Sequence, residues 1–202
     1  MNSLHHTKNI ASVFTPSITI YAIVYNIALI VGGAMLLALS SYISIPLWPV
    51  PITMQTYMVM VIGMTYGRKR AGATIGTFIV AGAVGLPVFS GGQTGLFFHL
   101  PSGGYIFGFF VSAVVLGYMS DRRHWDRSIK TSIVSMFIGT ILIYLFGLLW
   151  LPVAVPSLDS INKVLQAGLY PFIIGGVIKS ILAGFTIPFV WIMIKKQDVA
   201  RK

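Results

Sequence analysis

The side chains that could recognise a small molecule are concentrated in one long segment of this sequence, from Gly85 to Tyr105. The segment is rich in glycine and aromatic residues, includes Gln93 and His99, and contains no acidic residue. Loops of this length without secondary structure of their own are usually functional or disordered, and this apolar composition is poor for disorder. We therefore expect an ordered loop that enters or covers a cavity. The alternative is an interfacial loop whose aromatic rings lie at the depth of the lipid headgroups.

His99 and Ser102 are the pair in this loop that could perform catalysis rather than binding. A hydrolase would need an acid or a metal beside them, but no acidic residue is near them in the sequence. The chain also has no Cys, no Glu and no G-x-S-x-G motif. We therefore expect no catalytic residue and no metal site, and we assign these side chains to hydrogen bonding. Gln55 adds an amide that donates and accepts, while Gly103 and Gly104 could let the backbone approach a ligand or supply turns with positive φ.

Lys179 is the only formal charge inside an apolar segment. A cation at that depth is costly, so we expect it to face a pocket and to meet an anion such as a ligand carboxylate. The alternative is a lysine that extends to the membrane surface, because it lies about two turns from the start of its segment. No Asp or Glu lies inside any apolar segment, which leaves no carboxylate for a proton relay or a sodium site.

The composition is that of an all-α integral membrane protein. Of the 202 residues, 56% are hydrophobic and only 9% are charged, whereas a soluble domain has about 25% charged residues. The net charge of +10 does not indicate nucleic acid, because the cations lie at the ends of apolar segments, as topology determinants do. There is no Walker A motif, since Ile178 rather than Gly precedes Lys179-Ser180. Uphill transport would therefore need a partner ATPase.

The apolar segments predict six transmembrane helices in one membrane domain, residues 18–194. Residues 1–17, which include His5 and His6, are predicted to be a solvated cytoplasmic tail, and residues 195–202 a basic cytoplasmic tail. The second and third spans are short for a hydrocarbon core of about 30 Å, which needs about 20 helical residues. The predicted spans cover about 20–40, 53–66, 72–86, 104–120, 131–151 and 171–194.

The cations give the chain an orientation, because nearly all of them fall on one side of this arrangement. By the positive-inside rule both termini are cytoplasmic. Loops 1, 3 and 5 (42–51, 85–105 and 152–169) then meet on the outer face, and we expect them to roof an outward-facing ligand cavity. Only Lys163 falls on that face, while the opposite one holds Lys8, Arg68, Lys69, Arg70, Arg122, Arg123, Arg127, Lys130, Lys195, Lys196, Arg201 and Lys202.

The first span carries small residues at helical spacing, with Ala28 followed by Gly32. Small residues four apart let helices approach closely in lipid. Packing inside the bundle is the common use of this pattern, and docking to another membrane subunit is the more specific one.

Three motifs in this sequence resemble the BioY family. They are SIPLWPVPITMQT at 44–56, GLPVF at 85–89 and PSGGYIFGF at 101–109, and the similarity extends over nearly the whole chain. The resemblance implies a six-helix S component of an energy-coupling factor (ECF) transporter with an outward-facing biotin site. It also implies a membrane T component and two ATPase subunits as partners, although some members act with little or no module. Ala28 and Gly32 loosely match the face of the first helix that contacts the T component in this family.

One departure from the family pattern concerns the sixth helix. The family has an acid three residues before the lysine, and here that position is Gly176, with Lys179 retained. By the resemblance this acid helps to hold the ligand, and Asp159 or Asn162 in loop 5 could take over its role. A second departure is Ser102 in place of Thr, which keeps the hydroxyl.

The sequence therefore predicts a membrane-embedded subunit that captures biotin at the outer face for uptake, without a cofactor, and that could form homo-oligomers. The alternatives are an S component for a biotin precursor or another small vitamin, a small intramembrane hydrolase using His99 and Ser102, and a structural assembly subunit. The predicted substrate-binding residues are Gln55, Phe89, Gln93, His99, Ser102, Gly103, Gly104, Tyr105, Asp159 and Lys179.

Overall fold

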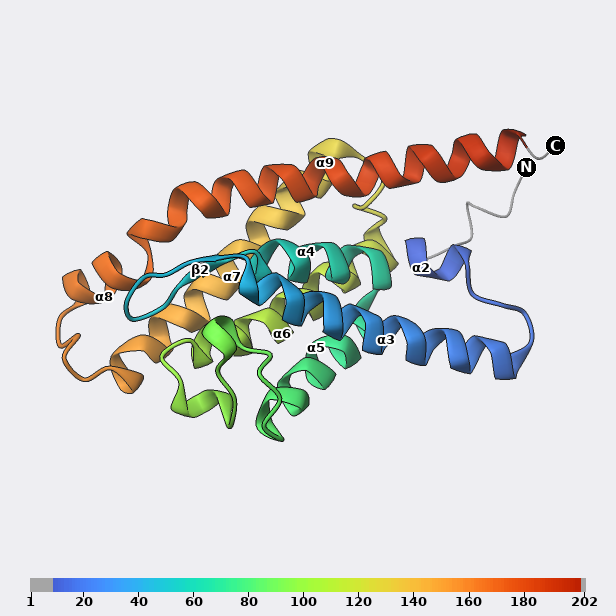
Figure 1. The fold of residues 1–202 in the computed structure, drawn as a ribbon. Helices are drawn as coiled ribbons and strands as arrows, with labels where there is room; N and C mark the ends of the chain where they lie inside the picture. Colours follow the sequence, from blue (N-terminus) through green and yellow to red (C-terminus); the bar gives the residue numbers. More distant parts are fainter. Residues whose placement is uncertain (1–8, 201–202) are drawn as a thin grey trace.

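The computed structural model describes residues 9–200, with side chains described for residues 9–196, and this part of the chain is a bundle of α-helices (Figure 1). A short antiparallel hairpin and three single turns connect some of the helices. The helices are α2 (Ile10–Val13), α3 (Thr19–Tyr42), α4 (Gln55–Tyr66), α5 (Arg68–Ala83), α6 (Gly103–Tyr118), α7 (Ile129–Ala154), α8 (Ile161–Gly168) and α9 (Tyr170–Ala200). The other elements are β1 (Ser44–Ile45), β2 (Ile52–Thr53), the 3₁₀ turns η1 (Ser90–Gly92) and η2 (Phe97–His99), and the π-helical turn η3 (Met119–Arg123).

Four of the six predicted spans are helices long and apolar enough to cross a membrane, namely α3, α6 with η3, α7 and α9. The second and third predicted spans coincide with α4 and α5, which have 12 and 16 residues. At 1.5 Å per residue these two helices are about 18 and 24 Å long, shorter than a hydrocarbon core of about 30 Å. The membrane-protein class is thus supported by four full-length helices and two shorter ones.

The central helix of the bundle is α6, which packs against α4, α5 and α7. Close approach depends on glycine: a Cβ at Gly63 of α4 would lie 2.9 Å from Leu116, and one at Gly108 would lie 2.8 Å from the backbone of Ile143. In contrast, only 17% of the most apolar stretch of α3 is buried, against 61% for α6. One side of α3 therefore faces lipid or another subunit.

The structure differs from the sequence prediction in the N-terminal tail, in loop 5 and in the C-terminal tail. The prediction of a solvated tail up to residue 17 is wrong for α2, because Ile10 and Ala11 are buried and the Asn9 Nδ2 group donates to Asp121 at 2.6 Å. His5 and His6 lie outside the described residues. The region predicted as loop 5 contains α8, which Ser160 caps by accepting a hydrogen bond from the Lys163 amide. At the other end of the chain, α9 continues through the predicted basic tail as far as Ala200, and residues 201–202 are outside the described part.

The two ends of the bundle differ in what they carry (Figure 1). The hairpin loop, α8 and the loop between α5 and α6 lie toward one end. At the opposite end are α2, the turn between α6 and α7, and the end of α9. The functional side chains predicted from the sequence belong mainly to the first of these ends.

Candidate functional site

Two neighbouring cavities lie among the loops at the hairpin end. The inner cavity has a volume of about 40 Å³ and the outer one about 230 Å³. Pro51, Ser90 and Ser102 line both, so these residues form the partition between them. The inner cavity is completed by Val50, Thr53, Gln55, Thr56, Tyr105, Ile106, Phe109, Tyr144 and Phe172, and the outer one by Ser44, Pro46, Leu47, Pro49, Gly91, Gln93 and Pro101.

Gln55 and Ser102 give the inner cavity its unsatisfied polar groups. Gln55 is 4% exposed, its Oε1 atom accepts from the Thr53 hydroxyl at 3.3 Å, and its Nε2 group has no hydrogen-bond partner among residues 9–196. The buried Ser102 hydroxyl also has no partner within this range. Leaving a buried polar group unpaired costs about 1–3 kcal/mol. A ligand with hydrogen-bonding groups would relieve this cost at both positions.

Aromatic rings from α6, α7 and α9 form the opposite wall. The Tyr105 hydroxyl donates to the Gly168 carbonyl at 2.6 Å, and the Tyr144 hydroxyl donates to the Phe172 carbonyl at 2.8 Å. The rings of Tyr105 and Phe172 stack with their centroids 5.9 Å apart. Because both hydroxyls bind backbone carbonyls, the wall offers mainly apolar ring surface to the cavity. The same two bonds hold α6 and α7 against the junction of α8 and α9.

Lys179 connects α9 to the hairpin. Its Nζ group donates to the carbonyl oxygen of Thr53, which lines the inner cavity, and the side chain is half-buried. The sequence predicted an anion as its partner, whereas the structure places a backbone carbonyl there. A carbonyl carries only part of a negative charge, so a ligand carboxylate would be a stronger acceptor for this ammonium group.

Four of the predicted substrate-binding residues line one of the two cavities: Gln55, Ser102 and Tyr105 the inner one, and Gln93 the outer one. Phe89 does not, because it is fully buried in the core, edge-to-face with Phe78 at 5.4 Å.

Gly103 and Gly104 line neither of these two cavities, and their positions have a structural explanation. They begin α6, and a Cβ at Gly104 would lie 2.2 Å from the Trp150 Cβ, while one at Gly103 would lie 2.4 Å from the Phe97 carbonyl. These glycines let α6 approach α7 and η2. Positive φ angles occur instead at Gly91 and Gly92, at 70° and 74°.

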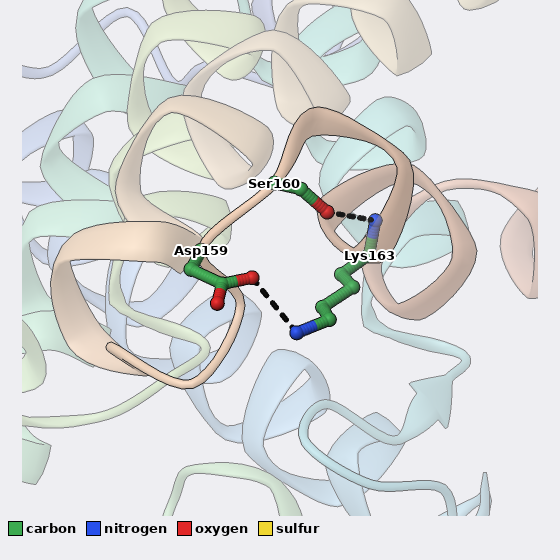
Figure 2. A network of polar contacts seen from close by, with 3 residues as sticks. All are labelled: Asp159, Ser160 and Lys163. Atoms are coloured by element: carbon green, nitrogen blue, oxygen red, sulfur yellow. Dashed lines mark hydrogen bonds and ion pairs between the residues drawn. The ribbon is translucent and has the colours of Figure 1, made fainter.

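His99 and Asp159 are exposed and line neither cavity. His99 ends η2, and its ring contacts that of Phe98 at 4.7 Å. The Asp159 side chain is 68% exposed and binds the Lys163 Nζ group at 2.8 Å (Figure 2). This hydrogen bond and the positive charge of Lys163 lower the pKa of the Asp159 carboxyl. The hydrolase alternative fails on this geometry, because His99 and Ser102 do not face a common cavity.

Tyr144 occupies the space that an acidic side chain at position 176 would need. A Cβ built on Gly176 would lie 2.2 Å from the Tyr144 hydroxyl oxygen. Where the family has an acidic side chain, the Tyr144 side chain of α7 therefore fills the space. Asp159 does not take the place of this acid, because it binds Lys163. Sequence reasoning missed Tyr144, Thr53, Ser90 and Phe172, and the only available signal was that Tyr144 is a polar group within an apolar span.

Together these features define a helical membrane protein with a small, partly polar cavity, lined by helix and loop residues, at one end of its bundle. Residues 7–196 match the family model of the BioY family, and the chain belongs to this family. The resemblance seen in the sequence motifs is thus confirmed, and with it the assignment to a transport protein rather than an enzyme.

Named relatives and a solved structure agree with this assignment. A "biotin transporter BioY" of Thermotoga maritima is 32% identical over 167 residues, which cover 82% of this chain and 93% of that protein. Another of the same name, from Rhizobium etli, is 33% identical and covers 77% of this chain and 86% of its own length. The solved S-component for biotin from an ECF-type ABC transporter superposes with a TM-score of 0.75 at 25% identity, covering 86% of this chain and 94% of that one.

Proposed function

We propose that this chain is the substrate-binding S component of an ECF-type transporter and that its ligand is biotin. Support comes from the family, from relatives named as biotin transporters and from the fold shared with an S component for biotin. The observation that carries the proposal is the inner cavity, which is lined by tyrosine and phenylalanine rings and by Gln55 and Ser102, whose Nε2 group and hydroxyl have no partner within the described residues. Biotin combines a ureido group, which donates and accepts hydrogen bonds, with an apolar ring and chain.

Ligand entry requires the loops to move. Pockets for small molecules usually measure about 300–1,000 Å³, whereas the inner cavity has only about 40 Å³. Displacement of Pro51, Ser90 and Ser102 would join the inner cavity to the outer one. Lys179 would then exchange the Thr53 carbonyl for the ligand carboxylate and release β2 from α9.

The orientation and the partners follow from charge and exposure. The end with Arg68, Lys69 and Arg122 would be cytoplasmic by the positive-inside rule, so the cavities would open at the outer face of a bacterial cytoplasmic membrane. Ala28 is exposed on α3, and the space beside Gly32 is open. This face would contact a T component, and two ATPase subunits would supply the energy. A second copy of the chain is an alternative occupant of the same face.

Equilibrium binding of biotin tests the proposal directly. We expect the purified chain in detergent, without partner subunits, to bind biotin with a Kd between nanomolar and low micromolar by isothermal titration calorimetry. Replacing Gln55 by leucine removes its hydrogen bonds at similar volume, which should weaken binding by about tenfold or more.

Asp159→Ala is the matched control, because it also removes a polar side chain at this end but lies outside both cavities. Its Kd should stay within about twofold of the wild-type value, as for a surface change away from the site. If the folded wild-type chain does not bind biotin, the ligand assignment is wrong. A biotin precursor or another small vitamin would then be tested in the same assay.

A further inference from the structure

A third cavity lies at the opposite end of the bundle from the ligand site. It has a volume of about 660 Å³ and is formed by α2, α3, the junction of α4 and α5, and the end of α6 with η3. We call it the basic pocket, because Arg68, Lys69, Arg70 and Arg122 line it against the single carboxylate of Asp121. It is larger than either cavity at the hairpin end and differs from both in its charge.

The one carboxylate in the basic pocket is already engaged by the protein. Asp121 Oδ1 accepts from Asn9 Nδ2 at 2.6 Å, and Oδ2 accepts from the Arg68 backbone amide at 3.0 Å. In residues 9–196, the side chains of Arg68, Lys69 and Arg122 form no ion pair. The pocket therefore has an excess of positive charge that the described part of the protein does not neutralise.

Arg70 gives the pocket a fixed cation. Its Nε donates to Asn26 at 2.7 Å and its Nη2 to Thr15 at 2.9 Å, and its guanidinium lies 6.0 Å from the Tyr25 ring centroid. Arginine has five N–H donors in a planar arrangement, so this anchoring leaves the Nη1 donors of Arg70 free within the described residues. A guanidinium already held in place binds a phosphate oxygen at a lower entropic cost than a mobile one.

The wall next to these cations is apolar. Ile30 of α3 lines the pocket, and the exposed side chains of Val31 and Met35 follow it on the same helix, in the direction that leads into the bilayer. They are 43% and 63% exposed. A free inorganic anion would gain nothing from this surface, whereas an amphiphile would bury its chains against it.

We propose that the basic pocket binds the headgroup phosphate of an anionic phospholipid, whose acyl chains lie along the exposed face of α3. Basic pockets between transmembrane helices are a known way of recognising anionic headgroups. The phosphate would bind Arg70 and attract the exposed cations of Arg68, Lys69 and Arg122. The site is independent of the biotin site and does not rest on the ligand proposed there.

Native mass spectrometry of the full chain in a neutral detergent tests this proposal. We expect phosphatidylglycerol to remain bound with one preferred site and phosphatidylcholine to bind at least about tenfold more weakly. The triple variant Arg68→Gln, Lys69→Gln and Arg122→Gln should lose this preference. Arg70 is left unchanged, because it ties α5 to α3 and its loss could disturb the fold.

The matched control removes three exposed cations from the same end of the bundle: Lys130→Gln, Lys195→Gln and Lys196→Gln. Its affinity for phosphatidylglycerol should stay within about twofold of wild type, since lipid attraction by scattered surface charges is screened by salt. Equal losses in both triple variants, or none in either, would overturn the proposal. Displacement of the lipid by an equal concentration of glycerol 3-phosphate would also overturn it, because the site would then take a soluble anion. Circular dichroism and size-exclusion elution confirm that each variant is folded.

Discussion

At the scale of single residues, the pocket is defined by polar groups that lack partners and by aromatic hydroxyls that already have them. Within the described residues, the Gln55 Nε2 group and the Ser102 hydroxyl have no partner, whereas the hydroxyls of Tyr105 and Tyr144 are bound to backbone carbonyls. Specificity would therefore come from the amide and the serine, and the tyrosines would provide shape. Tyr144 also fills the space beside Gly176, so no void is left there.

The contact between Gly176 and Tyr144 leads to a prediction about coupling. Gly176→Ala should destabilise the chain by about 1–3 kcal/mol, because the new methyl group overlaps the Tyr144 hydroxyl in a packed core. In the Tyr144→Phe background the cost of the same change should be smaller by about 0.5 kcal/mol or more. Thermal unfolding of the four proteins in detergent gives the double-mutant cycle. Equal costs in both backgrounds would show that the hydroxyl does not fill this space.

At the scale of elements, the hairpin is held to α9 by one bond between Lys179 and the Thr53 carbonyl. This bond joins the hairpin, which would have to move for a ligand to enter, to α9, which packs against the rest of the bundle. A ligand that binds Lys179 would therefore change how the hairpin is held. We therefore expect loss of the lysine to affect the binding of a ligand that carries a carboxylate more than it affects folding.

Lys179→Met tests the role of this charge. It keeps an unbranched side chain of similar length, so we expect the helix to persist while biotin binding weakens by about tenfold, the loss of a charge-assisted hydrogen bond. Biotin methyl ester should bind the variant and the wild type with similar affinity in the same calorimetric assay. If the variant weakens both ligands equally, the ammonium group does not pair with the carboxylate.

The sequence predicted elements better than contacts. A helix coincides with each of the six predicted spans, and four of these helices are long and apolar enough to cross a membrane, because hydrophobic length is a local property of the chain. The end of α9 lies six residues beyond its predicted end. The sequence did not predict the hydrogen bond between Asn9, at the start of α2, and Asp121. It also did not predict that Ser160 would cap a helix, α8, within loop 5. Gln55 and Ser102 were predicted as site residues because polar groups stand out in apolar surroundings, and both line the inner cavity. Phe89 and Gly104 line neither the inner nor the outer cavity, because Phe89 is a core residue and Gly104 lies at a close helix contact, which only tertiary packing reveals.

At the scale of the whole molecule, the cavities proposed for ligand capture are separate from the face of α3 proposed for partner docking. The cavities lie among the loops at one end, whereas α3 presents an exposed apolar side along the bundle. Changes on α3 should therefore affect assembly without changing the pocket.

Ala28→Leu tests this separation. We expect the variant to bind biotin in detergent with a Kd within about twofold of wild type, while uptake of labelled biotin by cells that also express an ECF module falls, because close helix approach requires small residues. Ala73→Leu enlarges an exposed alanine on α5 and is the matched control for a general effect of bulk. A parallel loss of uptake in both variants would remove the argument for a docking face on α3.

The unequal lengths of the helices have a consequence for the surrounding bilayer. The candidate membrane span within α9 runs from Tyr170 to Lys196 and has 27 residues, about 40 Å of helix, whereas α5 has 16 residues, about 24 Å. Lipids next to α9 meet a hydrophobic surface longer than their chains, and lipids next to α5 meet a shorter one, so the bilayer must thicken on one side or thin on the other. This hydrophobic mismatch gives the protein a preferred tilt. A change in the acyl-chain length of the lipids would change this tilt, and with it the energy needed to reorient the bundle.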